Sequence, residues 1–424
     1  MTADRTTKAG NGGVLIAGSF AVLNITTYAL TVVAAHRLGP AEFGQYSSLM
    51  GVLLVVNVVS LGLQSTGARR VALSPDDRAA VEASLFRLTL ICSALVAALT
   101  LVVGLALMST LSITSWVSPV MLAAAAGLLT LFGGQAGVLQ GEHRWRQLAT
   151  LYAAVGVGRL VAGVIAIVIQ PTTSALLTGV ALGAVLPVGV GLLTLARSTP
   201  EVDPERAPVG LAREVAHNTH ALLAFFAVSN VDILVARALL SEESAGLYAA
   251  GLVLTKAVLF LPQFVIVLAF PAMARAQHSR RTDVGALAAV GAVGAVASAV
   301  CWLLPGLTLA FVGGQRYAEV SGRLWQFAVL GTVLAMAQLL VYSALAQAHR
   351  MSTLALWSAL AGFIVWSWAT SGIAELLTAR MVTTALLLLA LVAVLLTRRG
   401  SVRSVVPGPA DADAHVQGDV HLGR

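Results

Sequence analysis

The chain has 424 residues, of which 58% are hydrophobic and only 11% are charged. A soluble globular protein carries about 25% charged residues, so this composition cannot cover a water-soluble surface and excludes a soluble enzyme. The formal net charge is +7. Such a charge fits either nucleic-acid binding or the cytoplasmic loops of a membrane protein, and the positions of the basic residues decide between them.

Twelve apolar stretches predict transmembrane helices, because a spanning helix needs about 20 mainly apolar residues. The first six are 12–35, 46–63, 85–107, 119–139, 148–169 and 174–196, and the second six are 219–234, 245–270, 284–311, 324–345, 353–370 and 373–397. The stretches lack the alternating pattern of a membrane-spanning β-strand. The sequence therefore predicts an all-α polytopic membrane protein.

The basic residues predict the orientation of these helices. With a cytoplasmic N-terminus, Arg159 and Lys256 lie within the membrane, and most of the other basic residues fall on the cytoplasmic side. The outside then receives only Arg37, Arg237, Arg316, Arg323 and Arg380. This asymmetry follows the positive-inside rule. It predicts a multi-pass protein of the plasma membrane with both termini cytoplasmic, and it explains the positive charge without a nucleic-acid partner.

An internal repeat divides the chain into two halves. Two segments, 33–48 and 235–250, match at a constant offset of 202 residues, and the matching pairs are Val33/Val235, Ala34/Ala236, Leu38/Leu240, Gly44/Gly246 and Tyr46/Tyr248. An offset of six helices makes the halves parallel and related by a pseudo-twofold axis along the membrane normal. The predicted parts are a cytoplasmic N-terminus (1–11), an N-terminal six-helix lobe (12–196), a cytoplasmic linker (197–218), a C-terminal six-helix lobe (219–397) and a disordered cytoplasmic tail (398–424).

Three stretches resemble bacterial polysaccharide flippases of the O-antigen and capsule type. They are HRLGPAEFGQYSSLMGVLLVVNVVSLGLQSTGARRVA (36–72), SNVDILVARALLSEESAGLYAAG (229–251) and FVGGQRYAEVSGRLWQFAVLG (311–331). These flippases belong to the superfamily that also contains the multidrug exporters and the lipid II flippase. The resemblance implies two lobes that alternate in access and move an undecaprenyl-diphosphate-linked oligosaccharide from the inner to the outer leaflet. It also implies glycan polymerases or glycosyltransferases as candidate partners.

Other functions remain open at this stage. A multidrug/cation antiporter of the same superfamily would need acidic residues in its cavity, whereas two cations and one acid are predicted within this membrane interior. A membrane glycosyltransferase or polymerase would need a carboxylate pair in a sizeable outer loop, which the sequence lacks. A non-transporting component of a glycan-assembly complex is a further alternative. We find no catalytic or metal-binding motif and expect neither an enzyme nor a bound cofactor.

Charges within the membrane are costly and therefore mark candidate functional residues. Arg159 and Lys256 are predicted to bind the diphosphate in a cationic cavity, and Asp232 is a candidate for binding a coupling ion. The alternatives are that Lys256 only pairs with Asp232, and that Arg159 snorkels or bonds to carbonyls. The repeat places Leu30 at the position of Asp232, Leu54 at that of Lys256 and Ala361 at that of Arg159, so the shared fold does not require these charges.

Four further residues are candidate substrate ligands. Arg37 and Arg237 lie at the outer ends of the first and seventh spans, where they could guide phosphate or only anchor the helices at the interface. Asn24 and Asn230 are candidate hydrogen-bond donors to the substrate. Polar side chains between membrane helices also hold helices together, which is the alternative for both asparagines.

Overall fold

The computed structural model describes residues 2–74, 77–196, 210–273, 280–345 and 350–397. Within these ranges the secondary structure is helical. The N-terminal lobe contains α1 (Thr2–Arg37), α2 (Pro40–Val56), α3 (Val58–Leu73), α4 (Arg78–Ala106), α5 (Val117–Gly141), α6 (Trp145–Ile169) and α7 (Thr173–Leu195). The chain turns only slightly at Asn57, so α2 and α3 form one membrane span.

The C-terminal lobe begins with α8 (Leu211–Leu239), which starts inside the range that the sequence predicted as linker. It continues with α9 (Glu242–Met273), α10 (Arg280–Leu303), α11 (Pro305–Val312), the 3-10 helix η3 (Gly314–Arg323), α12 (Leu324–Leu345), α13 (Arg350–Ser367) and α14 (Ile373–Thr397). The prediction of one helix over 284–311 was wrong. Pro305 has no backbone N–H to continue α10, and it stands instead at the first position of α11.

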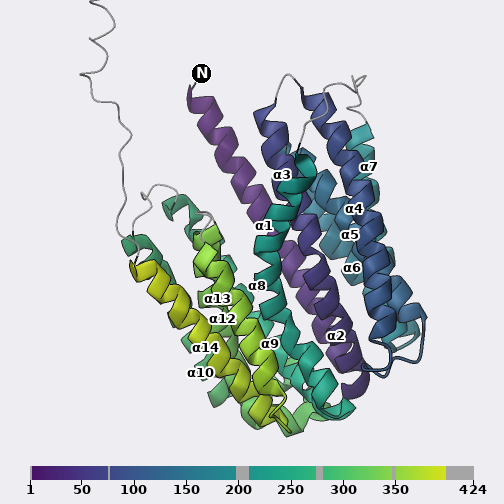
Figure 1. The fold of residues 1–424 in the computed structure, drawn as a ribbon, viewed down its shortest axis with the longest axis vertical. Coiled ribbons are helices and arrows are strands. Elements are labelled where there is room, and N and C mark those ends of the chain that lie inside the picture. The colour runs from purple at the N-terminus through teal and green to yellow at the C-terminus, as the bar shows by residue number, and fades with distance from the viewer. Residues whose placement is uncertain (1, 75–76, 197–209, 274–279, 346–349, 398–424) are drawn as a thin grey trace, which may run out of the picture.

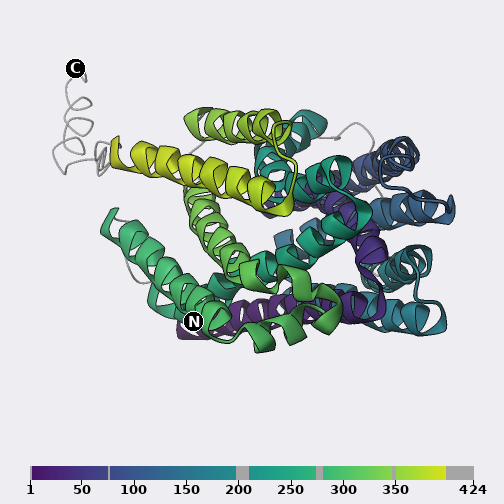
Figure 2. The same ribbon diagram turned by 90° about the horizontal axis from the view of Figure 1, so that it is seen from below.

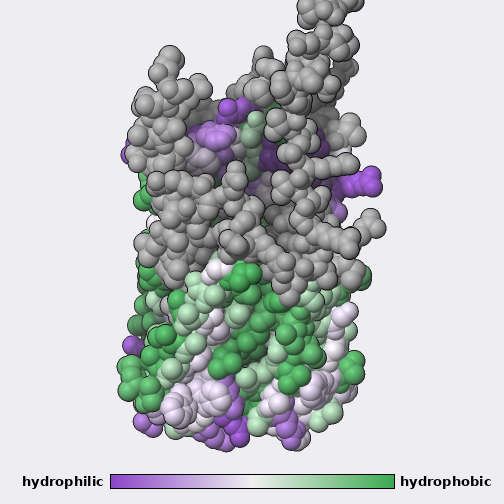
Figure 3. Space-filling model, turned by 90° about the vertical axis from the view of Figure 1, so that its left-hand side faces the viewer, coloured by the Kyte–Doolittle hydropathy of each residue, from purple (hydrophilic) through white to green (hydrophobic). Residues whose placement is uncertain are grey.

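Eleven of the described helical spans are long and apolar enough to cross a membrane, and the apolar part of α13, Thr353–Ser367, is shorter. This confirms the predicted all-helical membrane fold. Figure 3 shows apolar side chains over the lower part of one face and hydrophilic residues along the bottom rim. We call the end where α1 ends and α14 begins the distal end, and the opposite end, where α1 begins, the proximal end (Figure 1).

The two lobes lie side by side when seen from the distal end (Figure 2). α2 and α3 of the first lobe pack against α8 and α9 of the second. The repeat holds in the structure: at the offset of 202 residues, the end of α1 at Arg37 matches the end of α8 at Leu239, and the start of α2 at Pro40 matches the start of α9 at Glu242. The helix boundaries within the two matching segments therefore coincide.

Small residues allow the close helix packing inside the N-terminal lobe. α5 lies against α3, α4 and α7. A Cβ atom added to Gly133 of α5 would overlap the carbonyl oxygen of Ser60 in α3, whose hydroxyl donates to the Leu129 carbonyl at 2.6 Å. Lipid supplies no hydrophobic force between helices, so contacts of this kind stabilise a membrane bundle.

Candidate functional site

A buried ion pair joins α8 to α14 in the C-terminal lobe. Asp232 and Arg380 are each 1% exposed, and Oδ2 of Asp232 lies 3.3 Å from Nε of Arg380. Arg380 also donates to the carbonyl of Val228, and its guanidinium carbon lies 5.1 Å from the ring centre of Phe363. The second Asp232 oxygen accepts the backbone N–H of Ile233 at 3.1 Å. Both charges are therefore withdrawn from lipid and neutralise each other.

This pair corrects two expectations. The sequence reading placed Arg380 outside the membrane, yet it is the eighth residue of α14 and is buried. The alternative in which Lys256 is the partner of Asp232 is also wrong, because Arg380 makes the ion pair. Asp232 lies seven residues before the end of α8, so the two charges stand at the same depth, about 10 Å from the distal helix ends. This common depth could have been used to predict the pair from the sequence.

Lys256 of α9 is held by a neutral side chain. Its Nζ donates to Oδ1 of Asn230 at 3.1 Å, and Nδ2 of Asn230 donates to the Phe226 carbonyl at 2.9 Å. Lys256 is half-buried, while Asn230 is buried. Gly51 of α2 closely approaches the backbone of Asn230, so this amide lies at the contact between the lobes. Among the described residues the lysine makes no ion pair, and it lies within electrostatic range of Asp232.

Arg159 is a half-buried cation in the N-terminal lobe. It lies in the middle of α6, and its backbone packs against Gly183 of α7. Among the described residues it makes no ion pair, and Tyr46 of α2 is close enough to interact with it electrostatically. A guanidinium at membrane depth without a carboxylate leaves a positive charge that an anion can neutralise.

The repeated tyrosines reveal an asymmetry between the lobes, and the sequence reading did not assign them a role at the site. Tyr46 and Tyr248 are both buried, and each lies near an arginine of its own lobe: Tyr46 near Arg159, and Tyr248 near Arg380. The hydroxyl of Tyr248 has no hydrogen-bond partner within the described part of the chain. In the C-terminal lobe Asp232 neutralises the arginine. Leu30 stands at the equivalent position of the N-terminal lobe and is fully buried.

The other candidate residues are spread over the distal half. Arg237 is buried at the end of α8, where Nη2 donates to the Leu111 carbonyl at 2.8 Å and Nη1 to the Glu242 carbonyl at 3.2 Å. Arg37 is exposed at the end of α1, and Asn24 is half-buried on α1. The structure therefore brings Asn230, Asp232 and Lys256 together, and it places Arg159, Arg37 and Asn24 on elements of the N-terminal lobe.

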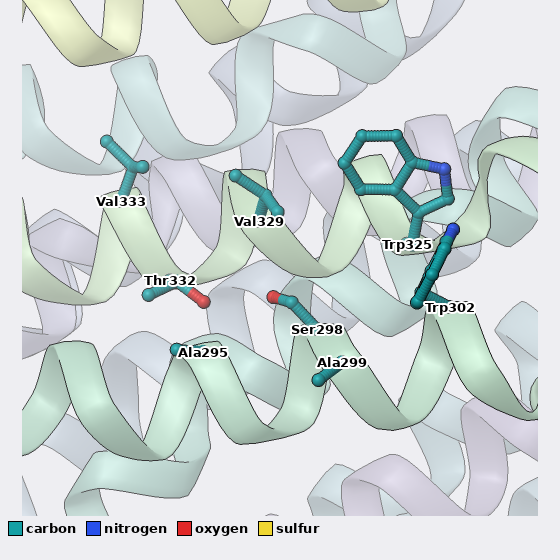
Figure 4. Close-up of a pocket in the computed structure, with 8 residues that line it drawn as sticks. All are labelled: Ala295, Ser298, Ala299, Trp302, Trp325, Val329, Thr332 and Val333. Carbon is teal, nitrogen blue, oxygen red and sulfur yellow. The ribbon is translucent and has the colours of Figure 1, made fainter.

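A separate groove of about 520 Å³ lies between α10 and α12. Figure 4 shows Trp302 and Trp325 at one end and Ser298 facing Thr332 in the middle. Both hydroxyls donate to carbonyls of their own helices, so the groove offers an apolar surface. None of the candidate charges lines it. In the described part of the chain, no group of three or more His, Cys, Asp or Glu residues could hold a metal ion.

Comparison with known proteins identifies a family and a fold. The profile of a family described as "Polysaccharide biosynthesis protein" matches residues 33–283. None of the curated proteins matches the sequence. The structure is similar to an inward-facing multidrug resistance MATE transporter of the MOP superfamily, with a TM-score of 0.69 and 13% identity over 88% of this chain and 93% of that chain.

Two further structures show the same fold. An outward-facing MATE transporter gives a TM-score of 0.59 at 14% identity over 91% of this chain and 93% of that one. The lipid II flippase MurJ in an inward closed conformation gives 0.63 at 10% identity over 89% and 87%. The chain therefore shares its fold with these MATE and MurJ structures.

Proposed function

Because the chain belongs to the family described as "Polysaccharide biosynthesis protein", we propose that it is a flippase for a lipid-linked oligosaccharide used in polysaccharide synthesis. The substrate class is an undecaprenyl-diphosphate-linked oligosaccharide, carried from the inner to the outer leaflet of the plasma membrane by alternating access. The fold shared with a lipid II flippase supports this proposal. Glycan polymerases or glycosyltransferases would act before or after the transport step.

The observation that carries the proposal is the free positive charge of the interior. Arg159 has no acidic partner in the described chain, and Lys256 rests on the neutral amide of Asn230. A diphosphate entering this space would replace lost hydration with charge-assisted hydrogen bonds, for which arginine offers a fork and lysine a point charge. Arg37, exposed at the end of α1, would attract the headgroup at the distal mouth, and Asn24 would donate to it from α1.

Asp232 is the proposed ion-coupling residue. It is the carboxylate of a buried pair with Arg380. Protonation would remove its charge and break that pair, leaving Arg380 to be compensated by another anion. A proton taken up from one side could thus be linked to binding of the anionic substrate. A carboxylate inside the C-terminal lobe also supports the second candidate, a multidrug/cation antiporter, but its neutralisation by Arg380 favours the anionic substrate.

The experiment is substitution in cells depleted of the native protein. We expect Arg159→Ala and Lys256→Ala each to abolish surface glycan and to cause a lipid-linked intermediate to accumulate on the cytoplasmic face, with folded protein still present. Arg159→Lys should retain part of the activity because it keeps the charge. Arg87→Ala, an exposed site on α4, is the control. Surface glycan at the parental level in both alanine variants would refute the proposal.

A further inference from the structure

The two copies of the repeated Gly-x-Tyr motif meet across the lobes at the distal end. A Cβ atom on Gly44 of α2 would lie 3.1 Å from Cα of Gly246 in α9. A Cβ atom on Gly246 would overlap the carbonyl of Pro40. The backbones of α2 and α9 can approach this closely only because both residues lack side chains. The repeat therefore gives each lobe one of the two equivalent glycines that form this contact.

Three side chains bridge the lobes around this contact, and each donates to a backbone carbonyl of the other lobe. Arg237 donates to Leu111 at 2.8 Å, Tyr317 of η3 to Ala35 at 3.1 Å, and Tyr28 of α1 to Val253 at 2.6 Å. The acceptor of Arg237 lies in the connection between α4 and α5. Gln45 of α2 holds that connection by donating to the Ser112 carbonyl at 3.0 Å.

The chemistry of Arg237 suits a contact that opens and closes. Its side chain is 1% exposed, and its one cross-lobe hydrogen bond among the described residues goes to a carbonyl. The Glu242 carboxylate, 3.6 Å away, belongs to its own lobe, and the Glu42 carboxylate of the other lobe lies within electrostatic range without an ion pair to it among the described residues. Its Nε is buried without a partner among the described residues. Opening the contact would hydrate this guanidinium, which offsets the lost bond to Leu111. A cross-lobe ion pair at contact distance would have bound the lobes far more tightly.

We infer that the apposed Gly44 and Gly246, latched by Arg237 on Leu111, form a reversible seal that closes the distal end and must separate when the lobes open there. This role concerns the conformational change and does not depend on which substrate is carried. It gives Arg237 a gating function, in addition to the phosphate-guiding or anchoring roles considered from its position in the sequence.

Cysteine labelling of the purified protein tests the seal without any transport assay. Ala250 is fully buried and lies one turn beyond Gly246 on the same face of α9. In a background with Cys92→Ala and Cys301→Ala, a cysteine introduced as Ala250→Cys should react slowly with a maleimide. Adding Arg237→Ala should speed the reaction roughly tenfold to hundredfold, the range for losing a hydrogen bond to a charged group. Gly246→Ala should do the same by holding the helices apart.

Three controls make each outcome decisive. Arg316→Ala removes an exposed distal arginine, and Gly39→Ala adds a methyl group where nothing lies within 4 Å, so neither should change the rate. Ala126→Cys reports on the core of the N-terminal lobe and should stay protected in every variant. An unchanged rate at position 250 in both the Arg237 and Gly246 variants would overturn the seal. If the cysteine at position 126 also became as reactive as that at position 250, Arg237 and Gly246 would instead be needed for the stability of the fold.

Discussion

The ion pair of Asp232 and Arg380 gives a sharp energetic prediction. Replacing Arg380 with methionine leaves a buried carboxylate that, within the described ranges, accepts a hydrogen bond only from the N–H of Ile233. Removing one partner of a buried pair costs about 3–5 kcal/mol. We therefore expect Arg380→Met to lower the free energy of unfolding by about that amount, with Lys256 reducing the loss if it moves toward the carboxylate.

The double variant decides whether the pair or the packing matters. Asp232→Leu introduces the residue that stands at the equivalent position of the N-terminal lobe, Leu30. Replacing a whole buried pair by apolar residues is often neutral or stabilising by about 1–4 kcal/mol. Asp232→Leu combined with Arg380→Met should therefore recover most of the stability lost in Arg380→Met. The coupling energy should exceed the roughly 0.6 kcal/mol that is typical of hydrogen bonds between membrane helices.

The assay is reversible unfolding in mixed detergent and SDS micelles for the parent, both single variants and the double variant. Arg69→Ala is the control, because Arg69 is 70% exposed and lies 3.5 Å from Glu214, so its loss should cost less than about 1 kcal/mol. A coupling energy near zero, or a double variant less stable than either single variant, would refute the argument that these charges neutralise each other.

Two further predictions concern packing and capping, and the same unfolding measurement checks both. Gly133→Ala should lower the free energy of unfolding by about 1–3 kcal/mol, because the added methyl group overpacks against Ser60. Gly189→Ala adds a methyl group within a helix where nothing lies within 4 Å, so it should be neutral or slightly stabilising. Equal effects of the two substitutions would contradict the packing argument. Glu42→Ala should cost about 1.5–3 kcal/mol, because the carboxylate accepts the backbone N–H of Thr173 at 2.7 Å and its hydroxyl at 2.6 Å. A change below about 0.5 kcal/mol would show that this bond adds little at the start of α7.

Much of the fold could be predicted from the sequence because a helix that crosses lipid needs about 20 mainly apolar residues. The apolar runs long enough to span became helical, and the short repeat predicted the two-lobed plan. The exceptions have local causes. Pro305 divides the ninth apolar run, and α8 extends to Leu211 because amphipathic residues continue its helix beyond the apolar core.

The site was less predictable because its contacts join helices that are distant in sequence. Hydropathy identified Arg159, Lys256 and Asp232 as charges within the membrane, but it cannot say which faces of the helices meet. Arg380 was misplaced because it lies near the start of the last predicted span and was counted with the charges outside the membrane. The acceptor of Arg237 is the backbone carbonyl of Leu111. Every residue has such a carbonyl, so no residue type in the sequence marks the acceptor.

The most direct test of the central claim is translocation by the purified protein in liposomes. A lipid-linked oligosaccharide with a diphosphate is placed in the bilayer, and its accessibility in each leaflet to a glycan-modifying enzyme is followed with time. We expect the parent protein to move the lipid between leaflets and Arg159→Ala, which removes the half-buried guanidinium, to be inactive. Translocation at equal rates by both, or by neither, would contradict a flippase that recognises its substrate through that charge.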